Sequence, residues 1–432
     1  MKSPYAPIQM ITRMSHEEIN IGHQIMGRII QILLTLHACF YLNFYILNNL
    51  LGKRIQDRDV IIGLTGITMF TIVATSALSF LRKWNYRVFY MTHITFATAF
   101  LPLMYFHVSH IRPFIWEAVA VYTVHILLRL FNTRTHTGTV SLIPGTNLIQ
   151  VTVPLISSTS KWKPGQHVYL SLPTWRGSGK YGLHRLRTNP FTVASLPRHD
   201  GQLVLVARAL KGNTQRLATL ARSATASDVT AEGKAETTPL ILEGPYGASS
   251  RLPDFSLFDR VLLIAGGVGA TFIVPVWRHI HSNEDYLSKA GDVRFVWAVR
   301  RLAETSWVFP PGRPDDSKHL EGVDIFVTGP HVAESAAAAN AVSDARESIE
   351  MAQRDQLLEE DDDKALAARG ITVRYSRPNL REVVDEAFRG HAERVAVLVC
   401  GPKGMGDSVR KEVGRWVRKG KDVYWHAEIF EL

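Results

Sequence analysis

Cysteine is scarce in this chain: only Cys39 and Cys400 occur among its 432 residues. This scarcity excludes a disulfide-stapled scaffold and a zinc site of the four-cysteine kind. Basic runs interleaved with aromatic residues are also lacking, although the formal net charge is +10. The positive balance therefore indicates basic loops beside membrane spans, and no nucleic-acid partner is predicted.

Charged residues are few in the first third of the chain, where four segments are long and apolar enough to cross about 30 Å of hydrocarbon. These segments are residues 29–51, 60–81, 88–108 and 114–131. Arg82, Lys83 and Arg87 lie between the second and third of them. By the positive-inside rule, this loop and everything after residue 132 face the cytoplasm, so the first and third spans run in the same direction.

Four histidines in this region form two pairs that have the same internal spacing. His23 and His37 are separated by the same 14 positions as His93 and His107. That interval is close to four helical turns, so each pair shares one helix face, roughly 21 Å apart. One interpretation is that each histidine hydrogen-bonds to a neighbouring helix. Two matched pairs on parallel helices favour a second one: His23 with His93, and His37 with His107, are the iron ligands of two stacked haems.

A basic residue follows the first of these histidines by about one turn. Arg28 would pair with a haem propionate, or it would serve as an anchor at the membrane interface.

The rest of the chain shows two kinds of pattern. Between residues 138 and 247, short β-rich runs alternate with turn residues, which predicts a small antiparallel barrel. Its expected strands are residues 148–153, 167–172, 191–194 and 203–207. Residues 223–239 have low complexity and predict a loop.

Beyond the barrel, strands alternate with helical stretches, which predicts an α/β domain with a parallel sheet. The expected strands are residues 260–265, 293–299, 324–327, 372–375 and 395–400. Residues 266–271, GGVGAT, join the first strand to a helix, where backbone amides can approach a phosphate, although such turns also occur without a ligand. Residues 333–369 are alanine-rich and then acidic, which predicts a mobile, solvated insertion.

Short segments along nearly the whole chain resemble the fungal ferric-chelate reductases (the ferric reductase transmembrane components), in the superfamily of the NADPH oxidases. The segments that carry this resemblance are GHQIMGR (22–28), WKPGQHVYL (162–170), NPFTVAS (189–195), ARALKGNTQRL (207–217), LEGPYG (242–247), LLIAGGVGAT (262–271), WAVR (297–300), CGP (400–402) and HAEIFEL (426–432). The resemblance implies a transmembrane haem-binding domain at 1–134, an FAD-binding barrel at 135–250 and an NADPH-binding α/β domain of the ferredoxin-NADP reductase kind at 251–432.

The resemblance also implies three cofactors or coenzymes: FAD, two b-type haems and NADPH. Residues that would shape the flavin site are Pro190, Phe191, Thr192, Val193 and Ser195. Residues that would cradle the FAD pyrophosphate are Arg208, Gly212 and Thr214. Residues that would seat the NADPH phosphates are Gly266, Gly267, Gly269 and Thr271.

Four more residues take roles from the same resemblance. Arg300 would pair with the 2′-phosphate of NADPH, or it is a surface charge at a strand end. Cys400 and Gly401 would lie near the nicotinamide, and Phe430 would stack on the flavin ring or pack in a core. No catalytic residue is expected beyond these cofactor sites.

Three departures from the family pattern stand out. Asn189 replaces the family's histidine, and Phe272 stands where the family usually has proline. Family members carry further spans ahead of the first haem-bearing helix, so we expect either a member shortened at its start or a gene whose start was misread.

The expected function is electron transfer from cytosolic NADPH through FAD and two haems to external ferric or cupric chelates. This would support metal uptake at the plasma membrane. One alternative is a superoxide-producing enzyme resembling the NADPH oxidases. The other, which the shortened start and Asn189 motivate, is a non-catalytic partner subunit or a membrane-anchored flavoprotein without haem transfer.

Overall fold

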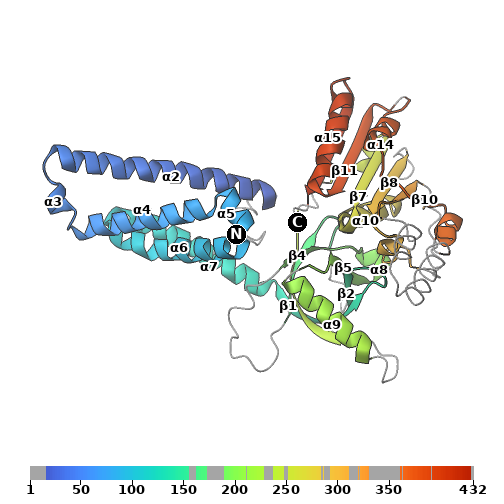
Figure 1. The fold of residues 1–432 in the computed structure, drawn as a ribbon, viewed down its shortest axis with the longest axis horizontal. Helices are drawn as coiled ribbons and strands as arrows, with labels where there is room; N and C mark the ends of the chain where they lie inside the picture. Colours follow the sequence, from blue (N-terminus) through green and yellow to red (C-terminus); the bar gives the residue numbers. More distant parts are fainter. Residues whose placement is uncertain are drawn as a thin grey trace, which may run out of the picture. The chain divides into compact units, whose positions relative to one another are not determined.

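The computed structural model divides the chain into two compact units, Met1–Asn132 and Thr133–Leu432 (Figure 1). The ranges that the structure describes are residues 16–154, 162–172, 189–210, 212–227, 237–247, 252–283, 286, 292–310, 320, 322–329, 361, 363–390 and 392–429. Most of the predicted acidic insertion and Phe430 lie outside these ranges.

The first unit is a bundle of four long helices with short helical connections. The long helices are α2 (His16–Leu47), α4 (Arg58–Ser76), α6 (Tyr86–His107) and α7 (Arg112–Phe131). The connections are α3 (Leu51–Arg54), α5 (Ser79–Trp84) and η1 (Ser109–Ile111). Helix α4 packs against both α2 and α6.

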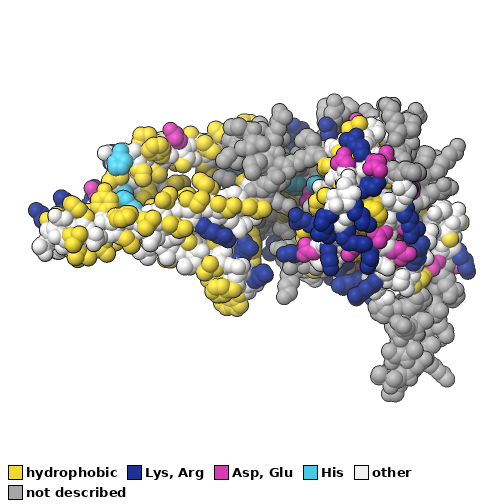
Figure 2. Space-filling view, turned by 90° about the horizontal axis from the view of Figure 1, so that it is seen from above, with side chains coloured by type: hydrophobic (Ala, Val, Ile, Leu, Met, Phe, Trp, Pro, Cys, Tyr) yellow, Lys and Arg dark blue, Asp and Glu magenta, His cyan; other side chains and the backbone are white. Residues whose placement is uncertain are grey.

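All four long helices are apolar and long enough to cross a membrane, and hydrophobic side chains cover the surface of the bundle (Figure 2). A water-facing helix would instead carry a polar face, so these exposed apolar side chains fit a lipid solvent. The four predicted spans are confirmed. Because α2 begins at His16, it also includes His23, ahead of the predicted span.

The second unit begins with an antiparallel sheet. Its strands are β1 (Thr133–Leu142), β2 (Leu148–Pro154), β3 (His167–Ser171), β4 (Asn189–Thr192), β5 (Gln202–Arg208) and β6 (Thr237–Tyr246). They lie in the order β4-β3-β6-β1-β2-β5, and a bridge between Val193 and Leu205 joins the two edges. The sheet therefore closes into a near-barrel, as predicted.

Helix α9 (Asn213–Ser227) packs on this near-barrel (Figure 1). Leu217, Ala218 and Ala221 of α9 belong to the same core as the strands. The helix and β6 correct the predicted loop at 223–239, because α9 continues to Ser227 and β6 begins at Thr237. Threonine and serine at these ends suggested a loop, but residues 237–239 pair with β1, and residues 223–227 continue a helix whose earlier turns pack on the barrel core.

The second sheet is parallel and six-stranded. Its strands are β7 (Arg260–Gly266), β8 (Val293–Val299), β9 (Val323–Val327), β10 (Thr372–Arg374), β11 (Arg394–Gly401) and β12 (Asp422–Ile429). Their order is β10-β9-β8-β7-β11-β12. The five predicted strands are confirmed within one or two residues, and β12 is an addition at the edge.

Helices cover both faces of this sheet. Helix α10 (Ala270–His281) shares a core with Leu263 and Leu398, whereas α14 (Leu380–Ala387) and α15 (Lys403–Val417) share one with Leu262 and Val397. Successive strand residues point to opposite faces, which explains why each strand reads as a continuous apolar run. The strand order reverses between β7 and β11, and ligands of such sheets bind beyond the carboxyl ends of the strands at that point.

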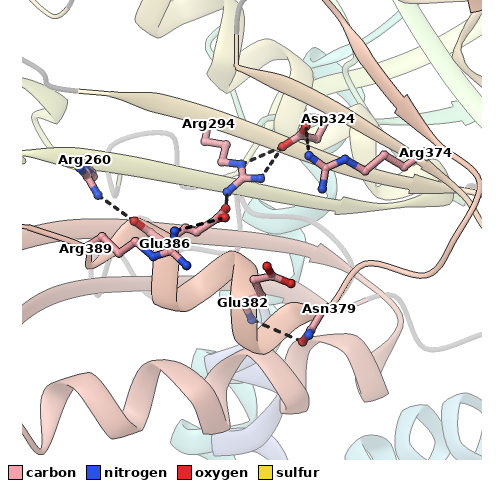
Figure 3. A network of polar contacts seen from close by, with 8 residues as sticks. All are labelled: Arg260, Arg294, Asp324, Arg374, Asn379, Glu382, Glu386 and Arg389. Carbon is pink, nitrogen blue, oxygen red and sulfur yellow. Dashed lines mark hydrogen bonds and ion pairs between the residues drawn. The ribbon is translucent and has the colours of Figure 1, made fainter.

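An ion-pair network lies toward the amino ends of β7, β8 and β9 (Figure 3). Arg294, near the start of β8, donates from Nε to Oδ2 of Asp324 over 2.8 Å and also pairs with Glu386 of α14. Arg374 approaches Asp324 from β10, with Nη2 3.8 Å from Oδ1. Arg260 donates from Nη1 to the carbonyl of Glu386 over 2.7 Å. The network joins the first residues of β7, β8 and β9 and the last residue of β10 to α14, away from the carboxyl ends of β7 and β11 where the strand order reverses.

We predict that Arg294→Met lowers the free energy of unfolding by about 3 kcal/mol, because it leaves the largely buried carboxylate of Asp324 without its closest partner. Arg381→Met is the matched control, since Arg381 makes an exposed contact with Asp385 within α14, and it should cost less than about 0.5 kcal/mol. Urea unfolding, followed by tryptophan fluorescence, measures both. Equal effects of the two variants would contradict the structural role of the network.

Candidate functional site

The glycine turn after β7 is packed against the end of β11. A Cβ at Gly269 would lie 2.1 Å from the carbonyl oxygen of Cys400, and a Cβ at Gly266 would lie 2.8 Å from Cδ of Pro402. Neither contact is sterically possible, so both positions require glycine for space. Gly267 has φ of +53° and therefore favours glycine for its backbone conformation.

Two side chains fix this turn. Trp297, in β8, donates from Nε1 to the carbonyl of Gly267 over 3.0 Å. Thr271 donates from Oγ1 to the carbonyl of Val268 over 2.9 Å and is almost fully buried. Helix α10 begins at Ala270, so the first amides of a 12-residue helix follow directly from the turn. This arrangement can hold a phosphate group at the helix N-terminus.

The other predicted residues of this sheet lie at the same carboxyl edge. Arg300 follows β8 and is exposed, whereas Cys400 and Gly401 end β11 and are buried. The side chain of Cys400 belongs to the core, and its backbone carbonyl faces Gly269. The structure thus brings Gly266, Gly269, Cys400 and Gly401 together.

The predicted flavin segment lies in β4 and in the bend after it. Phe191 and Val193 point into the barrel core, whereas Pro190 is exposed. Ser195 is buried, and its Oγ accepts a hydrogen bond from the amide of Val204 over 2.9 Å. The carbonyl of Ser195 accepts another from Nε1 of Trp162 over 2.7 Å. Ser195 therefore shapes the bend through contacts within the chain.

The predicted pyrophosphate residues lie between β5 and α9. Gly212 has φ of +82°, and Thr214 accepts at Oγ1 a hydrogen bond from the amide of Leu210 over 3.0 Å. Arg208 ends β5, but its guanidinium extends to the parallel sheet. A Cβ at Gly267 would lie 3.5 Å from Nη2 of Arg208, and Nη2 is 3.6 Å from Oε1 of Glu304.

Glu304 and two aromatic contacts were not identified from the sequence. Phe272, which departs from the family pattern, is buried and stacks on His426 of β12 with ring centroids 5.4 Å apart. It also packs against Gly165, since a Cβ there would lie 3.0 Å from the Phe272 ring. Trp162 anchors the flavin segment. Trp162 and His426 each open a segment that resembles the family, and Phe272 was noted as a departure from it, whereas Glu304 carried no signal.

In the helical bundle, the structure brings one histidine pair together. His23 of α2 and His93 of α6 face each other with ring centroids 6.0 Å apart and planes 75° apart. Nδ1 of His93 is buried and has no hydrogen-bond partner within the described part of the chain. No atom lies within 4 Å of a Cβ built at Gly27, four residues after His23, so open space adjoins this face of α2. Two imidazoles, apolar walls and open space are what a bis-histidine haem requires.

The second histidine pair is not in contact in the described part of the bundle. His37 lies against Tyr41, with ring centroids 4.7 Å apart. Nδ1 of His107 lies 2.9 Å from the carbonyl oxygen of Asp59. A carbonyl only accepts, so this Nδ1 carries the proton and leaves Nε2 as the ligand atom, which is the arrangement that metal-binding histidines favour. The joint role of His37 and His107 stays a prediction, as does that of Arg28, which is exposed.

Three family models match the chain in sequence order. They are a ferric reductase like transmembrane component at residues 2–104, an FAD-binding domain at 132–250 and a ferric reductase NAD binding domain at 258–414. The three together reach from the first described helix to α15.

Curated relatives match at low identity. A probable cell surface ferric reductase of Aspergillus oryzae is 27% identical over 330 residues, which cover 69% of this chain and 41% of the relative. Ferric reductase transmembrane component 4 of Saccharomyces cerevisiae is 25% identical over 445 residues, which cover 95% of this chain and 57% of the relative. The chain spans about half the length of these relatives.

Among solved structures, the ferredoxin reductase in carbazole 1,9a-dioxygenase matches with a TM-score of 0.40 and 15% identity. The match covers 69% of this chain and 70% of that one. The strand orders given above, rather than this likeness, establish the fold.

We predict that Gly269→Ala raises the dissociation constant for NADP⁺ at least about tenfold and lowers the free energy of unfolding by about 1–3 kcal/mol. The reason is that the new methyl group displaces the turn from Cys400. Isothermal titration calorimetry and thermal melting of the solubilised chain measure the two effects.

Gly414→Ala is the matched control, because Gly414 lies within α15 and a Cβ there meets nothing within 4 Å. It should leave NADP⁺ binding unchanged and stabilise the helix by about 0.5–1 kcal/mol. Unchanged NADP⁺ affinity in Gly269→Ala would show that the turn does not bind the coenzyme.

Proposed function

Since the chain belongs to the ferric reductase family, we propose that it transfers electrons from cytosolic NADPH across the membrane to an external ferric or cupric chelate. The observation that carries this proposal is the pairing of His23 with His93 between two candidate membrane spans. A chain that only anchored a flavoprotein would have no need for two imidazoles that face each other from two apolar helices.

In this proposal, the bundle holds two b-type haems and the second unit holds FAD. When bound, FAD supplies the change from two-electron to one-electron chemistry, and bis-histidine haems supply one-electron carriers without an open coordination site. His23 and His93 would hold the inner iron, and His37 and His107 would hold the outer one. The Nδ1 contact of His107 with the Asp59 carbonyl fixes the ring that presents Nε2.

The residues of the second unit bind and orient the two dinucleotides. The turn Gly266–Gly269 and the start of α10 hold the NADPH diphosphate, and Arg300 selects NADPH through the 2′-phosphate. The bend that Trp162 and Ser195 fix positions the flavin, with Thr192 at its edge and Gly212 and Thr214 near its pyrophosphate. Phe272 and His426 form an aromatic stack near the start of α10, and the buried Phe272 ring excludes water there.

Two histidine ligands would leave a bound haem iron without an open coordination site, so such a haem would supply outer-sphere electron transfer, and we propose a chelate outside the membrane as the acceptor. The names of relatives agree with a metal acceptor: another relative in Saccharomyces cerevisiae, 22% identical over 425 residues, is a ferric/cupric reductase transmembrane component. On the same basis we propose the plasma membrane as its location, as for the cell surface relative in Aspergillus oryzae.

We predict that His107→Ala abolishes reduction of external ferric chelate but leaves NADPH-dependent reduction of a soluble dye within about twofold. External reduction needs the outer haem, whereas the dye takes electrons from the flavin. The measurement uses sealed vesicles with the chelate on one side and NADPH on the other. His110→Ala, in the exposed turn beside α6, is the matched control and should retain both activities.

Undiminished external reduction in His107→Ala would contradict the two-haem proposal. Measuring superoxide in the same vesicles identifies the acceptor: formation of two superoxide ions per NADPH consumed, with no ferric reduction, would contradict a metal acceptor.

A further inference from the structure

A buried carboxylate lies where the near-barrel meets the parallel sheet. Glu304 belongs to η6 (Leu302–Thr305), the short helical turn that follows β8, and only 5% of it is exposed. Its Oε2 accepts no hydrogen bond from any described residue. Burial raises the pKa of Glu304, and the nearby charge of Arg208 is the largest effect opposing this rise. A carboxylate held in such a place needs a reason, because burying it costs free energy.

The partner of this carboxylate comes from the other sheet. Nη2 of Arg208, at the end of β5, lies 3.6 Å from Oε1 of Glu304, and the Arg208 side chain is 18% exposed. The same Nη2 lies 3.5 Å from the place where a Cβ of Gly267 would be. The guanidinium therefore lies between Glu304 and the glycine turn. An arginine has five N–H donors, so a contact with Glu304 on one edge leaves donors for an anion on the turn.

Glu304 is held in position independently of Arg208. The neighbouring Arg301 donates from Nη1 to the carbonyl of Gly145, in the turn between β1 and β2, over 2.9 Å. A Cβ at Gly145 would lie 3.6 Å from Cβ of Ala303. Val268 and Trp307 also pack on the barrel core at this boundary. The η6 turn is thus fixed against the near-barrel, and Glu304 is a rigid support for the guanidinium.

We propose that Glu304 is a positioning residue, which holds the Arg208 guanidinium on the Gly267 turn so that it contacts the diphosphate of NADPH. This inference rests on the proposed function, because it presumes that NADPH binds at that turn. It assigns Arg208 to the nicotinamide dinucleotide, whereas the sequence resemblance assigned it to the FAD pyrophosphate. Ordering the guanidinium before the ligand arrives reduces the entropy lost on binding.

The test measures NADP⁺ and FAD binding separately, by calorimetry on the solubilised full chain. We expect Glu304→Gln to weaken NADP⁺ binding about tenfold and to leave FAD binding within about twofold. Arg208→Gln should weaken NADP⁺ binding at least as much, and the double variant no further, because Glu304 acts through Arg208. Glu304→Asp, which keeps the charge, should restore part of the affinity.

Kinetics of dye reduction give a second measure, since loss of a ground-state contact raises KM for NADPH more than it lowers kcat. Glu412→Gln is the matched control: Glu412 also pairs with an arginine, Arg415, but within α15, and its removal should not change NADP⁺ affinity. Melting temperatures show whether each variant is folded. If Glu304→Gln does not fold, the NADP⁺ affinities of Glu304→Asp and Arg208→Gln test the proposal instead, because both should be lower than that of the natural chain.

Three outcomes are distinct. If the natural chain binds NADP⁺ and Glu304→Gln binds it equally well, the positioning role is wrong. If Glu304→Gln and Arg208→Gln weaken NADP⁺ binding additively, or weaken FAD binding instead, the assignment to the NADPH diphosphate is wrong. If the natural chain binds no NADP⁺, the proposed function itself fails, and with it the premise of this inference.

Discussion

The approach of Gly269 to the carbonyl of Cys400 is the constraint on which the nucleotide-binding half of the molecule depends. The ends of β7 and β11 meet where the strand order reverses, with backbone against backbone and no room for a side chain. The turn and the first residues of α10 therefore lie at the carboxyl ends of these strands. The position of the turn, and hence of any phosphate on it, follows from strand packing.

In the bundle, the corresponding constraint is that a membrane offers no water to polar groups. The backbone is satisfied within the helices, so the side chains that remain polar are the ones that need a function. His23 and His93 face each other from α2 and α6, and small residues on α4 allow α6 to approach closely. At Gly63 a Cβ would lie 2.8 Å from Cε1 of His107. The glycine on one helix therefore fixes where the histidine on another can lie.

The sequence predicted the elements better than it predicted their contacts. Strands such as β7 and β8 were recognised because both of their faces are buried. Their sequences are therefore uninterrupted apolar runs, and each run ends at a glycine or at a charged residue. Strand β1 was not recognised, because TRTHTGTVSL alternates weakly and is partly exposed. Equal histidine spacing anticipated the pairing of His23 with His93, since a helix converts sequence interval into position along one face.

The parts of the site that the sequence could not predict are contacts between distant segments. Nothing near Glu304 in the sequence indicates that Arg208 lies beside it, because the two meet only when both sheets are packed. The stack of Phe272 on His426 is likewise a tertiary contact, and a departure from the family pattern becomes intelligible through it. The joint position of His37 and His107 still rests on their spacing.

The central claim is that electrons from NADPH reach iron held by histidines in the bundle. The most direct measurement is a reduced-minus-oxidised absorption spectrum of the purified chain, recorded with NADPH and, separately, with dithionite. The account predicts a low-spin b-type haem signal with NADPH that reaches the amplitude seen with dithionite. Haem that dithionite reduces but NADPH does not would contradict the path from flavin to haem, and the absence of any haem signal would contradict the assignment of the four histidines.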